Sequence, residues 1–280
     1  MKIGAHVSSA GGVDKAIDRA EEIGAEAIQV FVSGPTTWRV KDPDDKIVSK
    51  YLARVEETSI DTTFFHGVYL INLGSPNPEL MNKGIDSLIK YQLVAEKIGC
   101  KGTIFHIGSH KGLGFEAVLP QVVDCFHRIL DATPEGPWLI IENSAGMGQS
   151  IGSSWGEISE VMHQVNSDRV KVCLDTQHSF ANGYNVATKE GLDEVMEEFD
   201  AKIGLANLVA VHANDSKVPF ERGLDRHENI GEGYIGTDGF KTIMGHAAFQ
   251  NVPFLMEVPG FEGNGVDKRS VDTLKAIREG

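Results

Sequence analysis

The sequence predicts an α/β protein built as a (β/α)8 barrel, and three observations lead to this fold class. Short apolar segments with the character of buried strands alternate with segments of helical periodicity along the whole chain. The strand segments are near-continuous apolar runs, which is typical of parallel sheets covered on both faces. The 280 residues show no break in composition and no linker, so a single barrel domain is predicted over residues 1–280.

Eight strands are predicted from these apolar runs. In chain order they are Lys2–Val7, Ala27–Val32, Thr62–His66, Gly102–His106, Trp138–Glu142, Val170–Asp175, Leu208–His212 and Pro253–Glu257. A doubly wound open sheet is the alternative architecture. It lacks support because no GxGxxG follows the first strand and the chain has no Walker loop.

Helices are predicted between the strands from apolar residues at helical spacing. Val13–Ile23 is followed by Gly24, and Leu88–Ile98 by Gly99, and glycine is typical just after a helix. Further along, Ser154 and Glu157 have the spacing of a capping box that opens a helix.

Two more helices are predicted in the second half of the chain. Residues 189–203 place Leu192, Val195, Met196 and Phe199 on one stripe, and their acidic residues are expected to face solvent. The last helix is predicted at Asp267–Arg278.

Charge and composition restrict the function classes. With 26 Lys and Arg against 40 Asp and Glu, the net charge is −14, which disfavours a nucleic-acid partner unless basic residues cluster or bound cations reverse the local sign. The three cysteines form neither a CxxC pair nor a disulfide framework. No apolar run reaches the roughly 18–20 residues of a membrane helix, and no signal-peptide pattern opens the chain, so we expect a cytoplasmic protein without a membrane partner.

Ionisable side chains stand at the carboxyl ends of six consecutive predicted strands, and the loop after the seventh strand adds two more. The nine residues are His66, His106, Glu142, Asp175, His178, His212, Asp225, His227 and Glu257. All strand ends of a barrel point to one face, which holds the active site. Any one of these residues could be an ordinary hydrogen-bonded polar group, but four carboxylates packed together resist ionising unless cations lie between them.

The ligand types suggest which metal is bound. Imidazole and carboxylate without thiolate suit Zn²⁺, and Mn²⁺ or Fe²⁺ also fit. Nine ligands exceed the need of one ion and suffice for two or three, an arrangement that clamps a phosphodiester during hydrolysis. The histidines His127, His163 and His246 are predicted within helices in structural roles. His6 and His110 lie at the functional ends of their strands and are expected to support the ligands or contact substrate.

With these residues in view, the sequence resembles the endonuclease IV family of apurinic/apyrimidinic endonucleases (family 2) over nearly its whole length. The matching stretches are IGAHVSSAGG at the start, HGVYLINLGSP, FHIGSH, IENSAGMGQSIG, CLDTQHSFANGY, HANDSK and DRHENIGEGYIG. Several are long and chemically unusual, so the resemblance is specific.

The resemblance implies a xylose-isomerase-like TIM barrel that binds three Zn²⁺ ions per chain, with Mn²⁺ or Fe²⁺ as a substitute at one position. It assigns His66, His106 and Glu142 to the first ion; Glu142, Asp175, His212 and Glu257 to the second; and His178, Asp225 and His227 to the third. Glu142 then has the catalytic role of bridging two ions that share the attacking hydroxide.

The resemblance also implies a function in base excision repair. Members hydrolyse the phosphodiester on the 5′ side of an abasic site in duplex DNA, leaving a 3′-hydroxyl and a 5′-deoxyribose phosphate, and they remove blocking groups from 3′ ends. For this chain it implies a monomer that is associated with the nucleoid when it acts on DNA. Three Zn²⁺ ions would add positive charge to the binding face, and the acidic surplus is expected largely on the outer helices.

The resemblance implies that a Tyr–Leu pair enters the duplex, here Tyr69 and Leu70, whose alternative role is ordinary loop packing. Further DNA contacts are expected from Trp38, Arg39, Lys217 and Arg226. Two positions depart from the family pattern. Thr36 stands where an arginine usually inserts into the base stack, so either Arg39 replaces it or DNA is bent differently, and Ile107 stands where proline is usual.

Two other function classes are compatible with parts of this pattern. A sugar-phosphate or keto-sugar isomerase also gathers His, Asp and Glu at barrel strand ends, but such enzymes usually need one or two ions, so metal counting would separate the two. A non-catalytic nucleic-acid-binding relative is disfavoured because every inferred ligand is present. Nicking of an abasic duplex would exclude it.

Overall fold

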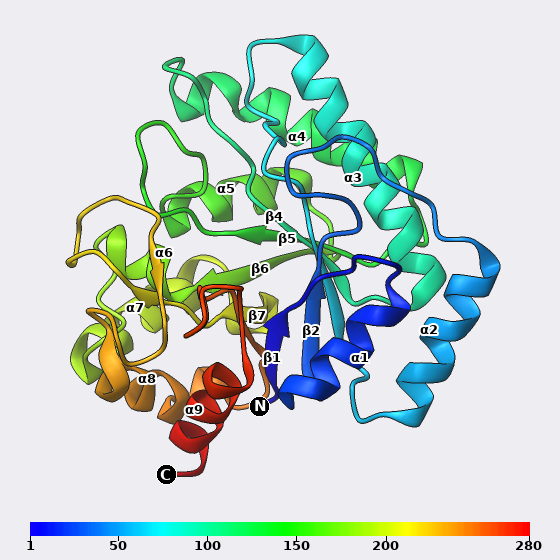
Figure 1. Cartoon of the computed structure of the whole chain (residues 1–280). Coiled ribbons are helices and arrows are strands. Elements are labelled where there is room, and N and C mark those ends of the chain that lie inside the picture. Colours follow the sequence, from blue (N-terminus) through cyan, green and yellow to red (C-terminus); the bar gives the residue numbers. More distant parts are fainter.

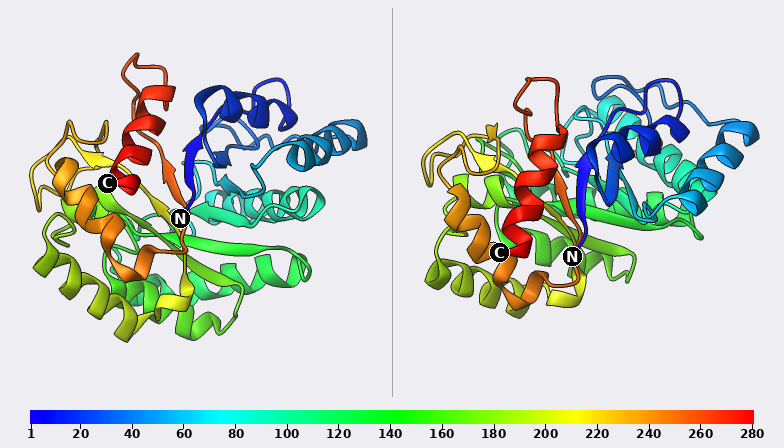
Figure 2. Two further views of the ribbon diagram at one scale, coloured as in Figure 1. Left: turned by 90° about the horizontal axis from the view of Figure 1, so that it is seen from below. Right: turned by 60° about the horizontal axis from the view of Figure 1, so that its bottom comes forward.

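The computed structural model describes residues 1–280 and contains a closed barrel of eight parallel strands surrounded by helices (Figures 1 and 2). The barrel strands are β1 Ile3–His6, β2 Ala27–Val30, β3 Thr63–His66, β4 Gly102–Phe105, β5 Trp138–Glu142, β6 Val170–Asp175, β7 Leu208–His212 and β10 Phe254–Met256. Strands are hydrogen-bonded in chain order, and β10 closes the ring against β1. The predicted fold class and all eight predicted strands are confirmed, with ends that differ by up to two residues.

The helices follow the strands and cover the outside of the barrel. They are α1 Asp14–Ile23, α2 Asp45–Glu57, α3 Pro78–Ile98, α4 Phe115–Ala132, α5 Trp155–Val165, α6 Thr176–Ala181, α7 Lys189–Lys202, α8 Gly236–Gly245 and α9 Lys268–Glu279, with 3-10 turns η1 Leu205–Asn207 and η2 Ala247–Phe249. A short hairpin, β8 Asp215–Ser216 and β9 His227–Glu228, follows β7. No helix has an apolar stretch of the length needed to cross a bilayer.

Helix ends follow the local sequence signals with one change. Gly24 and Gly99 adopt the left-handed conformation that ends α1 and α3. Ser154 caps α5 by accepting from the N–H of Glu157, but the Glu157 carboxylate accepts from the N–H groups of Gly152 and Ser153 instead of that of Ser154. The capping box is therefore displaced toward the preceding loop.

Two helical regions differ from the sequence-based expectation. His246 is not within a helix: it lies between α8 and η2, where its Nδ1 accepts from the N–H of Ala248. The helix α2 is not among the predicted helices, although its apolar residues have helical spacing; they are Ile47, Val48, Tyr51, Leu52 and Val55, of which only Tyr51 is fully buried.

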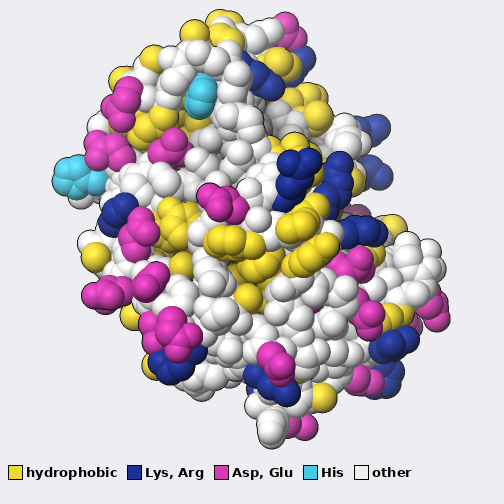
Figure 3. Space-filling view, turned by 90° about the vertical axis from the view of Figure 1, so that its left-hand side faces the viewer, with side chains coloured by type: hydrophobic (Ala, Val, Ile, Leu, Met, Phe, Trp, Pro, Cys, Tyr) yellow, Lys and Arg dark blue, Asp and Glu magenta, His cyan; other side chains and the backbone are white.

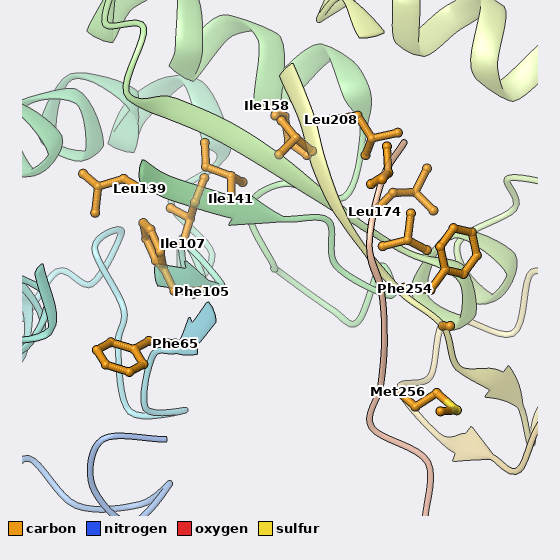
Figure 4. Packing of buried hydrophobic residues seen from close by; sticks show 14 of the residues in the cluster. Phe65, Phe105, Ile107, Leu139, Ile141, Ile158, Leu174, Leu208, Phe254 and Met256 are labelled. Atoms are coloured by element: carbon orange, nitrogen blue, oxygen red, sulfur yellow. The ribbon is translucent and has the colours of Figure 1, made fainter. Parts of the chain in front are cut away.

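Two apolar layers form the core. The larger packs the outer strand faces against the helices, and Figure 4 shows part of it, including Phe65, Phe105 and Phe254. The smaller fills the barrel with one side chain from each of seven strands: Ala27, Phe64, Ile104, Ile140, Cys173, Ala210 and Leu255. The eighth strand contributes Gly4 because a Cβ there would lie 2.6 Å from Leu255 Cδ2.

The inner layer determines where the functional side chains point. Side chains two positions apart on a strand share a face. On each strand, the side chain two residues after the inner-layer residue therefore also points into the barrel. It lies one layer closer to the carboxyl ends of the strands. These eight residues are His6, Gln29, His66, His106, Glu142, Asp175, His212 and Glu257, and all of them are polar.

Candidate metal centre

The ionisable residues expected at strand ends come together in three groups at the carboxyl end of the barrel. Within each group the nearest ligand atoms lie within 4.8 Å of one another. The groups are His66, His106 and Glu142; Glu142, Asp175, His212 and Glu257; and Asp175, His178 and His227. Glu142 and Asp175 each belong to two groups, so the groups are adjacent.

Glu142 lies between four imidazoles and is buried. Its Oε2 lies 3.1 Å from Nε2 of His66 and 3.3 Å from Nε2 of His106, while its Oε1 lies 2.9 Å from Nδ1 of His212 and 3.2 Å from Nδ1 of His178. Burial disfavours a charged carboxylate, but the surrounding imidazoles outweigh it and hold the pKa of Glu142 well below its usual value.

The second group surrounds Nδ1 of His212. Besides Glu142, that nitrogen has Glu257 Oε2 at 3.3 Å and Asp175 Oδ2 at 3.8 Å. Three carboxylates around one imidazole nitrogen form an oxygen-rich donor set, which suits a divalent cation.

In the third group, Asp175 occupies the place expected for Asp225, although Asp225 is close by. Asp225 Oδ1 lies 3.4 Å from Nε2 of His178 and 3.3 Å from Nε2 of His227. Burial disfavours protonation of His178, but Asp175 and its other carboxylate neighbours outweigh this and raise the pKa of His178 well above its usual value. All nine predicted ligands thus line one mouth of the barrel.

Backbone and amide groups orient the imidazoles. The Nδ1–H of His66 donates to the carbonyl of Gly67 (2.7 Å), and that of His178 donates to the carbonyl of Asn143 (2.9 Å). In the neutral imidazole that binds a metal, these bonds leave each Nε2 with its lone pair directed into the site. Nε2 of His178 and Nε2 of His227 are both buried without a hydrogen-bond partner. Unpartnered buried nitrogens and convergent carboxylates fit divalent cations.

Three amide residues that sequence reasoning missed support the ligands. Gln29, fully buried, donates from Nε2 to Glu257 Oε1 (2.6 Å) and accepts at Oε1 from Nε2 of His212 (2.7 Å). Asn214 donates to Asp175 Oδ2 and accepts from the N–H of Glu257. Asn143 accepts from the N–H of Asp175. Amide residues in or next to apolar strands are the signal that could have identified them.

The two supporting histidines differ in position. Nδ1 of His6 lies 3.0 Å from Glu257 Oε1, next to the second group, and burial lowers the pKa of His6. With Arg39, His6 lines a cavity of about 830 Å³ beside the metal groups, between the loops after β1 and β2. His110 bonds within its own loop, where Nδ1 accepts from the N–H of Gly114. Its contact with ligands or substrate stays a prediction.

The residues expected to contact DNA lie in loops after the strands. Tyr69 and Leu70 are 60% and 37% exposed in the turn after β3, and the Tyr69 ring packs edge-on against Phe31 and His66. Trp38 is half-buried against the core, whereas Arg39 is exposed.

Lys217 and Arg226 face each other in the β8–β9 hairpin loop. The N–H of Lys217 donates to the carbonyl of Arg226 (2.9 Å), and the Arg226 guanidinium donates to the carbonyl of Asp225. Figure 3 views the side on which α6 lies in Figure 1. Hydrophobic side chains gather near the middle of this face, with Lys and Arg side chains beside them.

Comparison with known proteins identifies the family. A family model described as a xylose isomerase-like TIM barrel matches residues 17–279. The probable endonuclease 4 of Halothermothrix orenii is 37% identical over 276 residues, which cover 98% of this chain and 99% of that protein. The crystal structure of endonuclease IV from Thermus thermophilus superposes with a TM-score of 0.87 at 28% identity, covering 100% of this chain and 99% of that chain.

A D-tagatose 3-epimerase-like protein has the same fold, with a TM-score of 0.74 at 17% identity, and it covers 100% of this chain and 97% of its own. At that identity the likeness extends to the fold alone. The family match over nearly the whole length and the high identity to its relatives lead to one conclusion: the chain belongs to the endonuclease IV family, on a xylose isomerase-like TIM barrel.

Proposed function

We propose that this protein is a zinc-dependent DNA-repair endonuclease that hydrolyses the phosphodiester 5′ of abasic sites in duplex DNA. The products would be a 3′-hydroxyl and a 5′-deoxyribose phosphate, and blocked 3′ ends would be a second substrate. The family membership and the names of its relatives support a DNA endonuclease. We further propose a monomer that works at DNA inside the cell.

The observation that carries the proposal is the set of three adjacent ligand groups, together with the unpartnered nitrogens of His178 and His227. The groups would hold three Zn²⁺ ions, with Asp225 joining His178 and His227. When bound, such ions lower the pKa of water and neutralise negative charge on a phosphodiester. Three adjacent cations suit the several charged oxygens of a phosphodiester better than they suit a keto sugar, whose carbonyl group offers a single oxygen.

The chain's own residues would position the substrate and exclude water. The Glu142 carboxylate, shared by two groups, would keep the two ions that it binds close together. Tyr69 and Leu70 would enter the duplex from the turn after β3, because both side chains are exposed there and the Tyr69 ring packs against His66. Lys217 and Arg226 would contact phosphates from the opposite hairpin.

The deciding experiment combines metal analysis with an incision assay. We expect the purified protein to contain three zinc equivalents and to nick a duplex with a single abasic site. Chelation should remove both the metal and the activity, and added Zn²⁺ should restore them. Incision that persists after complete removal of metal, or a protein unable to bind zinc, would contradict the proposal.

Replacing Tyr69 by Ala should weaken binding to abasic duplex more than it impairs removal of 3′ blocks, because only the internal site must be turned out of the helix. Stacking of one base on an aromatic ring contributes about 1–3 kcal/mol, which corresponds to about 5-fold to 150-fold in Kd. Leu205→Ala is the control, since Leu205 is an exposed apolar residue (37%) of η1, which precedes β7 and so lies at the end of the barrel opposite the ligands. Equal loss in both assays would contradict insertion of Tyr69.

Replacing Thr36 by Arg tests what substitutes for the arginine that the family usually has there. Thr36 and Arg39 are both exposed in the loop after β2. If Arg39 already stacks within the DNA, the new arginine should leave Kd for abasic duplex unchanged. If no residue replaces the missing arginine, the new arginine should instead strengthen binding to abasic duplex by up to about 1–3 kcal/mol. That result would show that Arg39 does not replace the missing arginine. Gel-shift titration measures either outcome.

A further inference from the structure

The carboxylate of Asp215 is buried in a cradle of backbone N–H groups close to the metal centre. Asp215 begins β8, three residues after His212, and is fully inaccessible to solvent. Its two oxygens accept at 2.7–3.3 Å from five backbone N–H groups, those of Ser216, Gly231, Gly233, Ile235 and Gly236. No lysine or arginine pairs with it.

This arrangement uses the whole accepting capacity of the side chain. An ionised carboxylate accepts only, at about four lone-pair positions, and a buried charge without a counterion must be stabilised by such bonds. Four of the five donors belong to residues 231–236, the segment that follows His227. Asp215 therefore determines the path of that segment.

The cradle and the hairpin restrain the chain on both sides of His227. Before it, the N–H of Lys217 donates to the carbonyl of Arg226, and Ser216 pairs with His227 in the β8–β9 ladder. After it, the Asp215 carboxylate holds residues 231–236, and the N–H of Tyr234 donates to the carbonyl of Ser216 (2.8 Å). Asp225 and His227 approach His178 from this restrained hairpin.

We propose that Asp215 is a positioning residue for the third metal site, where it holds Asp225 and His227 in place without touching an ion or the substrate. The inference rests on the proposed function, because that function assigns an ion to His178, Asp225 and His227. The other two ion sites depend on strand residues and on the side chains of Gln29 and Asn214. Asn214 precedes Asp215 in the chain, but its side chain bonds Asp175 Oδ2 and the N–H of Glu257 and none of the groups that the Asp215 carboxylate holds. We therefore expect the loss of the Asp215 carboxylate to weaken the third site most.

Gly233 is the cradle residue that lies against the Asp215 carboxylate, to which its N–H donates. A Cβ at this position would lie 2.5 Å from Asp215 Oδ1 and 2.5 Å from the carbonyl of Ser216. Gly233→Ala therefore disturbs the same bonds from the opposite side, with no change of charge. It provides a second, independent variant.

The test is zinc binding by the full chain at buffered free Zn²⁺, measured for wild type, Asp215→Asn and Gly233→Ala. An asparagine would direct its NH2 group at N–H donors. We expect both variants to bind one of the three ions about 10–100-fold more weakly, the usual effect of losing a group that supports metal ligands, and to keep the other two. Asp225→Asn provides the reference for direct damage to the third site. Asp238→Asn, an exposed carboxylate of α8, controls for charge.

The outcomes separate this inference from the proposed function. If both variants bind three ions with wild-type affinity, Asp215 does not position the third site, and the proposed endonuclease function is unaffected. Parallel loss of all three ions with a lower unfolding midpoint would also overturn the positioning role of Asp215, because the role would then be merely structural. A wild-type protein that binds only two ions would contradict the three-ion proposal, and this inference with it.

Discussion

Replacing Glu142 by Gln should reduce incision of an abasic duplex by about 10³-fold or more while the fold is retained. Loss of one group that stabilises developing charge typically costs about 10²–10³ in kcat. Glu142 should exceed this because one carboxylate serves two ligand groups. The amide has the same shape, so the buried site can still pack.

The geometry explains why an amide cannot replace this carboxylate. Each Glu142 oxygen faces two imidazole nitrogens at 2.9–3.3 Å. Gln would direct an NH2 group at one pair of nitrogens and would remove the negative charge that the two proposed cations would share. Zinc content should therefore fall together with activity, because two of the three groups lose a ligand.

Single-turnover incision at saturating enzyme, elemental analysis and circular dichroism of the same preparation measure the effect. Glu190→Gln is a matched control, because Glu190 is exposed on α7 and is not a ligand, and this substitution removes the same charge. An active Glu142→Gln protein with full zinc content would contradict the bridging role. A misfolded one would be recognised from its spectrum.

The barrel could be predicted because each strand carries its own signal. Near-continuous apolar runs such as those ending at Glu142 and Asp175 need no information about their neighbours. The same runs locate most of the metal centre, because barrel geometry brings all strand ends to one face. Of the nine expected ligands, six are strand-end residues whose side chains enter the barrel by the two-residue period.

Other features depend on contacts between distant segments and could not be predicted from local patterns. Asp175, an expected ligand of the second group, also belongs to the third, because the loop after β6 turns immediately into α6 and brings His178 back over it. The cradle of Asp215 forms only when residues 231–236 fold onto β8.

Gln29 is the exception, since the sequence contained its signal. A buried amide in the apolar run AIQVF is costly unless it is bonded, and its position two residues after Ala27 places it in the same layer as the ligands. The two-residue period applied to all eight strands identifies Gln29 and His6 together with the six strand-end ligands. Polar residues of this layer are therefore functional candidates even where they are not ionisable.

Replacing Gln29 by Leu should weaken zinc binding at the second group by about 10–100-fold, which is typical for loss of a group that orients a ligand. Leucine fills similar volume but leaves the buried Nε2–H of His212 without its acceptor, and it leaves Oε1 of Glu257 with His6 as its remaining partner; both atoms contact Gln29 at present, at 2.7 and 2.6 Å. The imidazole of His212 would then no longer be held with Nδ1 toward Glu142 and Asp175.

Gln29→Glu is the informative companion variant, because it keeps the acceptor for His212 but sets a second carboxylate against Glu257. If orientation of His212 is the main role of Gln29, Glu should preserve zinc affinity better than Leu. If the bond to Glu257 matters more, the order reverses. Zinc titration with a competing chelator gives the affinities, and incision rates at saturating zinc should recover in both variants. Unchanged affinity in both would show that the metal ligands hold their positions without Gln29.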